Sequence, residues 1–235
     1  MEENTEQIDL DRAFADYFGD PDRRHVRRRP VLVAKRFLDL FVASVGILVT
    51  LPVIATAAVA TLLDTGRPVF YTQVRRGLQG RRIRVWKMRT MKQDTDVTVT
   101  DSLSVEEHGR FLTIPLDSEV YTKVGRVLEV LWIVELPQLW SVLVGEMSIV
   151  GNRPLPDYVI EVLGTSPDVL DRFGSPPGIT GYPQISGREL VSDDDRIRLE
   201  KEYTGIYRKG NIFFEDLRII ALTLFRYVVR PLRKN

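Results

Sequence analysis

The amino-acid sequence predicts a mixed α/β protein, mainly helical, that is attached to a membrane. The run from Leu40 to Leu63 contains no charged residue, so it is long and apolar enough to enter a bilayer. Two short segments after it, 68–74 and 82–88, have the alternation and flanking turn residues of β-strands. The later apolar stretches have helical spacing, which makes the helical content dominant.

The composition limits the kinds of chemistry that the chain can perform. At 235 residues, it has the length of one main domain. The 33 basic and 32 acidic residues nearly balance, so total charge does not indicate a nucleic-acid partner. With no cysteine and only two histidines, thiolate zinc sites, cysteine nucleophiles and multi-histidine metal sites are not expected. Chemistry must therefore depend on carboxylates, Lys, Arg, Ser, Thr or Tyr.

Residues 1–30 are expected to form a polar N-terminal arm that becomes strongly basic before Pro30. This region is not a signal peptide, because its basic part lies far from the start and no small-residue cleavage pattern follows. A solvated arm is one interpretation of this region. Binding to lipid head groups or to a protein partner is the other.

Residues 31–64 are expected to form a re-entrant membrane hairpin that breaks at Pro52. A spanning helix usually has its excess of positive charge on one side only, whereas this segment is basic on both flanks. Neither end therefore has the features of a translocated segment. The alternative is an ordinary transmembrane helix kinked at Pro52, since membrane helices tolerate proline.

Residues 65–235 are expected to form the globular domain. Residues 92–118 are polar and acidic without a clear period, which is typical of a loop. In the apolar stretch 124–144, Glu135 needs either a cation or a proton, and Arg126, Arg153 and Arg188 are the candidate cations. Such a carboxylate is either half of a structural ion pair or part of an active site.

The C-terminal segment 213–235 places Arg218, Arg226 and Arg230 on one part of the helical circle and apolar residues elsewhere. We expect an amphipathic helix in the membrane interface, with packing on the core as the alternative. The glycine-rich segment 178–188 has a different character. It carries Gln184 and Arg188 between closely spaced glycines, a composition suited to holding an anion.

Several ordered motifs resemble those of the bacterial sugar transferases, the monotopic polyprenyl-phosphate phosphoglycosyl transferases. The resemblance covers about residues 35–228. The motifs are, in order, KRFLDL, RPVFYTQVRRG, VWKMRTM, VGRVL, ELPQLWSVLVGEMSIVGNRPLP, PGITGYPQISGR, RIRLEKEY and EDLRII. The resemblance implies a small α/β catalytic-type domain, mainly helical, seated by a re-entrant hairpin and interfacial helices on the cytoplasmic face of the bacterial inner membrane.

This resemblance also implies a reaction. Members of the family move a sugar-1-phosphate from a nucleotide diphosphate sugar to polyprenyl phosphate, with Mg²⁺, through a phosphosugar carried on an aspartate. Membrane lipids and proteins of exopolysaccharide assembly are further implied partners, and nucleic acid is not. The residues implied for binding phosphate and nucleotide sugar are Lys87, Arg89, Arg126, Arg153, Gln184, Arg188 and Arg196.

One departure from the family pattern concerns catalysis directly. The chain reads IVELPQL where the family has Asp before Glu, so Val134 stands at the nucleophile position and Glu135 follows it. Valine offers no lone pair to phosphorus or Mg²⁺, so no metal ligand is assigned. The sequence therefore leaves two functions open. One is a transferase in which Glu135 acts or the phosphates react directly, with Mg²⁺ if it is active. The other is a catalytically silent relative that serves exopolysaccharide assembly as a scaffold or regulator.

Overall fold

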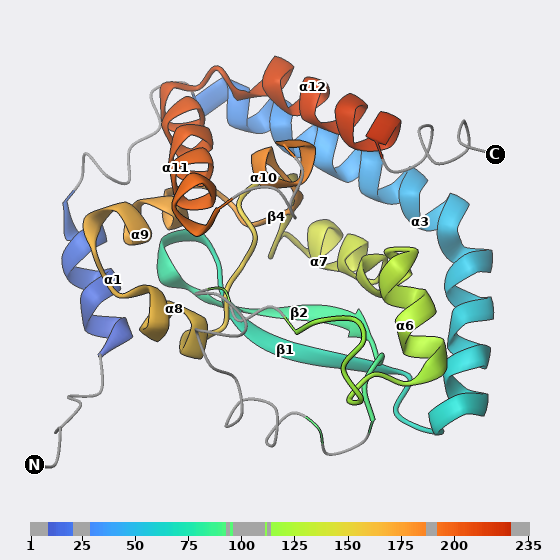
Figure 1. Cartoon of the computed structure of the whole chain (residues 1–235). Helices are drawn as coiled ribbons and strands as arrows, with labels where there is room; N and C mark the ends of the chain where they lie inside the picture. Colours follow the sequence, from blue (N-terminus) through green and yellow to red (C-terminus); the bar gives the residue numbers. More distant parts are fainter. Residues whose placement is uncertain are drawn as a thin grey trace, which may run out of the picture.

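The computed structural model describes residues 9–20, 29–92, 95, 111, 114–186 and 192–226, and Figure 1 shows their arrangement. The helices are α1 (Leu10–Gly19), α3 (Arg29–Thr65), α6 (Lys123–Val130), α7 (Gln138–Val144), α8 (Asp157–Leu163), α9 (Pro167–Asp171), α10 (Tyr182–Ser186), α11 (Asp193–Lys209) and α12 (Ile212–Leu224). The strands are β1 (Phe70–Arg76), β2 (Arg82–Met88), β3 (Ser148–Val150) and β4 (Gly178–Thr180), and the 3-10 turns are η1 (Leu78–Gly80), η2 (Ile133–Glu135) and η3 (Arg172–Gly174). The fold is mixed α/β and mostly helical, as the sequence predicts.

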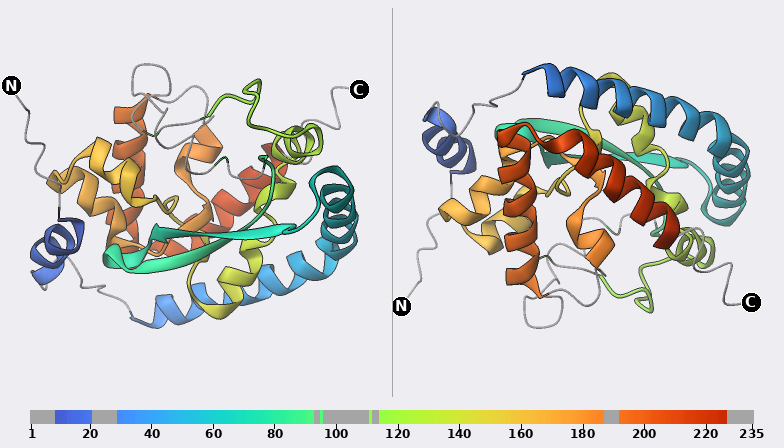
Figure 2. Two further views of the ribbon diagram at one scale, coloured as in Figure 1. Left: turned by 90° about the horizontal axis from the view of Figure 1, so that it is seen from below. Right: turned by 90° about the horizontal axis from the view of Figure 1, so that it is seen from above.

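The sequence predicts a re-entrant helical hairpin that breaks at Pro52, and the structure has one continuous helix, α3, with Pro52 inside it. Figure 1 shows two straight parts that meet at an angle, and in both views of Figure 2 the helix curves around the β1–β2 hairpin. Proline removes one helical hydrogen bond and clashes with the preceding turn, so it is a sufficient cause for the bend. Part of α3, Pro30–Thr65, is long and apolar enough to cross a membrane, and only 11% of its most apolar window is buried.

Both parts of α3 are attached to the same globular body. Near its start, Lys35 Nζ lies 2.5 Å from Asp216 Oδ2 of α12 and donates to the carbonyl of Val150 in β3. One turn later, the Asp39 carboxylate accepts hydrogen bonds from the Ser148 hydroxyl and the Ile149 N–H. These groups are buried, so their mutual hydrogen bonding offsets the cost of removing them from water.

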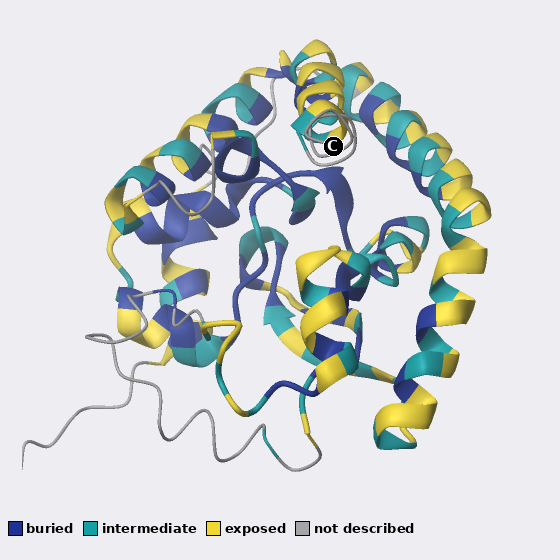
Figure 3. Ribbon diagram, turned by 45° about the vertical axis from the view of Figure 1, so that its right-hand side comes forward, coloured by how far each residue is buried: buried dark blue, intermediate teal, exposed yellow. Residues whose placement is uncertain are grey.

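The other end of α3 is held by a buried arginine. The guanidinium of Arg89 donates to the carbonyls of Thr65, Gly66 and Arg67, at 2.8, 2.6 and 3.2 Å. Thr65 is the last residue of α3, and Gly66 and Arg67 follow it, so Arg89 satisfies one terminal carbonyl of the helix and the two after it. The outer side of α3 is exposed along its length, as Figure 3 shows, and includes Phe37, Leu48 and Leu63.

The strands form two small sheets. The strands β1 and β2 pair antiparallel, with Phe70 opposite Met88 and Arg76 opposite Arg82, whereas β3 and β4 pair parallel. In β2 the odd-numbered Ile83 and Val85 are buried, and the even-numbered positions 82, 84 and 86 are exposed. The predicted alternation of this segment is therefore present.

The N-terminal arm, although polar in composition, contains the helix α1. The helix α1 packs Leu10, Phe14 and Phe18 into a core that also contains residues of α8, α9 and η3. A side chain at Gly80 would collide with the Phe14 ring, with its Cβ 2.3 Å from Cγ, so glycine is needed there for close packing. A wholly solvated arm was therefore wrong for residues 10–19, while the basic part of the arm, 21–28, lies outside the described residues.

A second core lies between α3, β2, α7, β3, α11 and α12. At its edge, α12 buries Asp216 and Ile219 and exposes Phe214 and Leu224, and Phe225 directly after it is also exposed. The predicted C-terminal helix therefore exists over residues 212–224 and both packs on the core and exposes apolar side chains. Arg230 lies outside the described residues.

Candidate functional site

The β1–β2 hairpin places two basic side chains on the same face. Tyr71 lies opposite Lys87 in the register, and Arg75 is four residues further along the strand of Tyr71. Because directly opposed residues and alternate residues of a strand share one face, Arg75 and Lys87 point to the same side of the hairpin. Arg75 Nη1 also donates to the carbonyl of Pro154 at 2.8 Å, next to Arg153.

A sharp turn between α6 and α7 places Glu135 against these cations. Trp132 has a left-handed backbone with φ 60°, η2 follows it, and the two helical segments on either side are bent by 86°. Glu135 is 8% exposed, and its Oε1 lies 2.5 Å from Nη2 of Arg153. The sequence named three candidate partners for this carboxylate; the structure pairs it with Arg153, Arg126 binds other groups, and Arg188 lies outside the described residues.

Arg153 is supported from behind by a buried ion network. Its carbonyl accepts a hydrogen bond from Arg172 Nη2 at 2.9 Å, and Arg172 Nε lies 2.6 Å from Glu200 Oε2. Arg196 Nε lies 3.5 Å from the other oxygen of Glu200, and its guanidinium covers the Phe111 ring. The network connects α11 and η3 to the segment after β3 and so fixes the backbone at Arg153.

The cluster concentrates positive charge in a poorly solvated place. Burial lowers the pKa of Lys87 well below its ordinary value, and the like charges of Arg75 and Arg153 lower it further. Burial, with repulsion from Arg153, also lowers the pKa of Arg75 to about 10. For Arg153, burial alone would lower the pKa, but the Glu135 carboxylate outweighs it and the pKa is raised. Such a group of cations is suited to an anion, which would relieve their mutual repulsion.

The described residues contain no preformed metal site with several protein ligands, although Mg²⁺ beside phosphates commonly needs only one or two carboxylates. They include no group of three or more His, Cys, Asp or Glu side chains that could hold a metal. Of the carboxylates beside the cations, Glu135 is paired with Arg153 and Glu129 accepts from the Thr90 hydroxyl at 3.0 Å. Val134, buried at 4% exposure, has no ligand atom. We therefore assign no chemical step to Mg²⁺.

The structure brings together some of the predicted site residues and separates others. Lys87, Glu135 and Arg153 form the cluster. Arg89, one residue beyond β2, caps the end of α3 instead. Arg126 is exposed and donates to the carbonyls of Asp117 and Ser118, away from the cluster.

The remaining predicted residues lie on other elements. Arg196 belongs to the network behind Arg153. Gln184 is buried in the short helix α10, directly after β4. Arg188 lies outside the described residues. Pro52 lies in α3 and lines the apolar groove described below.

Sequence reasoning missed Arg75 as a member of the site. It lies in a quoted motif beside Arg76, and the sequence gives no reason to separate the two. The strand does separate them, because Arg76 turns to the other face and pairs with Asp157 and Asp11. Two-residue periodicity applied to 70–76 could have placed Arg75 on the face of Tyr71.

A half-buried cluster of cations beside a long, exposed apolar helix is typical of a membrane-associated α/β protein with a site suited to an anion. Comparison with known families is more specific, since residues 31–230 match the model of the family described as "Bacterial sugar transferase". The match covers most of the chain. The chain belongs to the bacterial sugar transferase family.

Three curated relatives illustrate the similarity. The chain is 36% identical to the uncharacterized sugar transferase EpsL of Bacillus subtilis (strain 168), over 84% of this chain and 89% of EpsL. It is 34% identical to the galactosyl transferase CpsE of Streptococcus agalactiae serotype III (strain NEM316), over 82% of this chain and 42% of CpsE. It is 32% identical to a UDP-glucose:undecaprenyl-phosphate glucose-1-phosphate transferase of Klebsiella pneumoniae, over 83% of this chain and 40% of the relative. The chain thus spans about two fifths of two of these relatives and most of the third.

Proposed function

We propose that this chain moves a sugar-1-phosphate from a nucleotide diphosphate sugar to polyprenyl phosphate, in exopolysaccharide or glycoconjugate assembly. The observation that carries the proposal is the convergence of Arg75, Lys87 and Arg153 on one poorly solvated place. A diphosphate donor and a phosphate acceptor repel each other, so their reaction needs such a set of cations. The name of the Klebsiella pneumoniae relative states a donor and an acceptor of these classes.

The reaction takes place at the cytoplasmic face of the inner membrane, with α3 dipping into one leaflet and returning. The attachment of both parts of α3 to one globular body supports this placement, through Lys35 at its start and Arg89 at its end. The exposed apolar residues of α12 add to the membrane contact at the interface.

The transfer itself is direct attack between phosphates. An oxygen of the acceptor phosphate bonds to the phosphorus that carries the sugar, and the bond from that phosphorus to the bridging oxygen breaks. Nucleoside monophosphate leaves with both electrons of that bond. Glu135 is charge-paired with Arg153 at 2.5 Å, which weakens it as a nucleophile and supports a positioning role for it.

A catalytically silent family member is the second candidate, and the buried Val134 favours it. If Val134 stands where relatives carry the nucleophilic aspartate, the two-step route is closed. Such a protein would bind nucleotide sugar and lipid phosphate, as a scaffold or regulator of an exopolysaccharide assembly complex.

Release of nucleoside monophosphate distinguishes the two candidates. Purified protein in nanodiscs is given polyprenyl phosphate and a panel of nucleotide diphosphate sugars, with and without Mg²⁺, alongside Val134→Asp and Val134→Asn. Direct transfer predicts acceptor-dependent release by the unaltered protein.

The Val134 variants give the contrast. If only Val134→Asp releases nucleoside monophosphate, by about 100-fold or more over Val134→Asn, the unaltered chain is silent and direct transfer is rejected. Val134→Asn is the control for Val134→Asp, because Asn has the size and polarity of Asp. Its amide cannot act as the nucleophile.

A further inference from the structure

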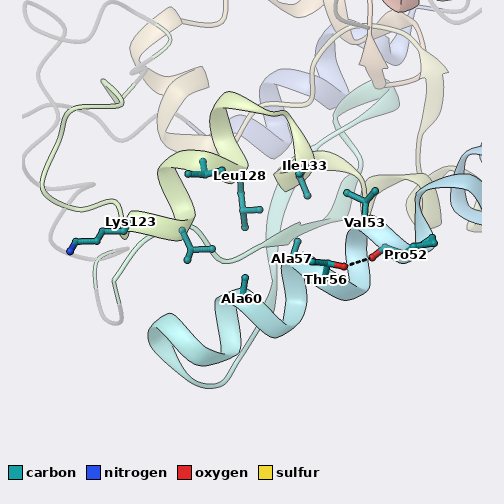
Figure 4. Close-up of a pocket in the computed structure, with 10 residues that line it drawn as sticks. Pro52, Val53, Thr56, Ala57, Ala60, Lys123, Leu128 and Ile133 are labelled. Carbon is teal, nitrogen blue, oxygen red and sulfur yellow. Dashed lines mark hydrogen bonds between the residues drawn. The ribbon is translucent and has the colours of Figure 1, made fainter. Parts of the chain in front are cut away.

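An apolar groove runs between the second part of α3 and the helix α6. Its volume is about 650 Å³, within the range of roughly 300–1,000 Å³ that is common for ligand sites. Figure 4 shows Ala57 and Ala60 of α3 on one wall and Leu128 and Ile133 on the other. Lys123 is the charged residue among those that line it.

The surroundings of the groove indicate where a ligand would come from. One wall is the membrane helix α3, whose neighbouring Val59 and Leu63 are 56% and 82% exposed. On the opposite wall, Val127 of α6 is 54% exposed. Because the groove is lined almost entirely by apolar side chains, water inside it would lack hydrogen-bond partners. A hydrocarbon chain supplied by the bilayer is therefore its natural occupant.

The groove leads toward the cation cluster. Ile133 lines the groove, and Glu135 lies two residues further along the same turn η2. At its base, Ala57 and Leu128 pack on Met88, whose side chain lies on the face of β2 opposite to Lys87. Glu129, the residue after Leu128 in α6, is close enough to the cations to raise the pKa of both Lys87 and Arg153. A chain lying in the groove would therefore have one end beside the cations and the other in the membrane.

We propose that this groove holds the first isoprenoid units of the polyprenyl phosphate acceptor. The inference rests on the proposed function and adds the place where the lipid is recognised. A polyprenyl phosphate is one branched chain with phosphate at its end, which matches one groove that ends near cations. A phospholipid carries two chains joined through glycerol, so it fits this arrangement less well. The small side chains of Ala57 and Ala60 leave room for the methyl branches.

The test uses photocrosslinking, so it does not depend on turnover. Protein in phosphatidylethanolamine–phosphatidylglycerol nanodiscs is irradiated with a diazirine-bearing farnesyl phosphate, and the labelled peptides are mapped by mass spectrometry. We expect labelling on residues 52–60 and 123–133, competed by unlabelled polyprenyl phosphate and not by added phosphatidylglycerol.

A matched pair of variants tests the groove itself. Ala60→Leu, which fills it, should reduce the labelling at least about tenfold. Ala55→Leu, the same change on an exposed position of α3 outside the groove, should leave it unchanged. Thermal unfolding and binding of nucleotide sugar by both variants report whether the fold and the donor site are intact.

Each other outcome overturns a different statement. Labelling at another surface, or labelling that survives Ala60→Leu, rejects the groove but leaves the proposed function standing. Equal competition by phosphatidylglycerol rejects the isoprenoid and identifies a general lipid contact. If polyprenyl phosphate binds nowhere on the protein, the proposed function fails together with the groove.

Discussion

At the residue scale, the site is defined by side chains that cost stability. Burial and the charge of Arg153 disfavour the charged forms of Arg75 and Lys87, whereas Arg153 itself is stabilised by the Glu135 carboxylate. Uncompensated cations of this kind are expected where an anionic ligand supplies the missing negative charge. They lower the stability of the free protein and strengthen the binding of that ligand.

Lys87→Met should therefore stabilise the free protein while weakening donor binding. In the folded protein the pKa of Lys87 is depressed below its ordinary value of 10.5, so the unfolded chain binds this proton more tightly. Unfolding is thus favoured at lower pH, and the stability of the unaltered protein rises with pH between the depressed value and 10.5. At pH 7 we expect a gain of about 1 kcal/mol in the free energy of unfolding and at least about tenfold weaker binding of nucleotide sugar.

Denaturant unfolding at pH 7 and pH 9.5 measures the free energy of unfolding, and calorimetry measures the binding of nucleotide sugar. The stability that Lys87→Met gains over the unaltered protein should be smaller at pH 9.5 than at pH 7. Lys201→Met is the matched control, since Lys201 is about half exposed and pairs with Asp168 on the surface. It should change neither quantity appreciably. Lower stability with unchanged binding in Lys87→Met would show that Lys87 is structural.

At the element scale, neighbouring residues of one motif serve different elements. Lys87 and Arg89 are both in VWKMRTM, yet Lys87 faces the cations and Arg89 binds carbonyls at the end of α3 and just after it. Close packing continues beyond the strand, because a side chain at Gly125 would lie 1.9 Å from the carbonyl oxygen of Thr90. The end of β2 thus contacts α3, α6 and the cation cluster.

Arg89→Met should destabilise the protein by about 1–2 kcal/mol, because partly buried carbonyls at the end of α3 and just after it lose their donor. Donor affinity should change less than about twofold, since Arg89 does not join the cation cluster. Arg126→Met is the comparison, because Arg126 is exposed and a surface change costs within about 0.5 kcal/mol. A strong loss of donor affinity in Arg89→Met at unchanged stability would restore Arg89 to the phosphate site.

At the scale of the whole molecule, the segments before and after α3 belong to one core. Phe14 of α1 and Val159 of α8 are buried in the same cluster, although the membrane helix lies between them in the sequence. If α3 crossed the bilayer, α1 and α8 would be on opposite sides and could not share a core. The structure thus gives a physical reason to expect both ends of α3 on one face.

Single cysteines can test this topology, because the natural chain has none. Ala15→Cys in α1 and Glu161→Cys in α8, both at exposed positions, should react with an impermeant maleimide only after the inner membrane is opened. Leu48→Cys, exposed on α3 near the bend, should be protected by lipid in both conditions. Reaction of Ala15→Cys alone in intact spheroplasts would show a helix that spans the membrane.

The sequence by itself determined the elements whose cause is local. The absence of charge from 40 to 63 requires an apolar helix, Pro52 weakens it at one point, and alternation in 82–88 makes a strand with Ile83 and Val85 inside. It also determined the family, through motifs that keep their order along the chain.

Only the tertiary structure decided which charged residues meet. The partner of Glu135, the separation of Arg75 from Arg76 and the distance of Arg89 from the cations all depend on how the hairpin, the α6–α7 turn and the segment after β3 are packed. The helix α1 was hidden for the same reason, since its apolar face has meaning only against the core that it covers. Periodicity reports which face of an element is buried, but the contacts between elements distant in the chain are set by packing.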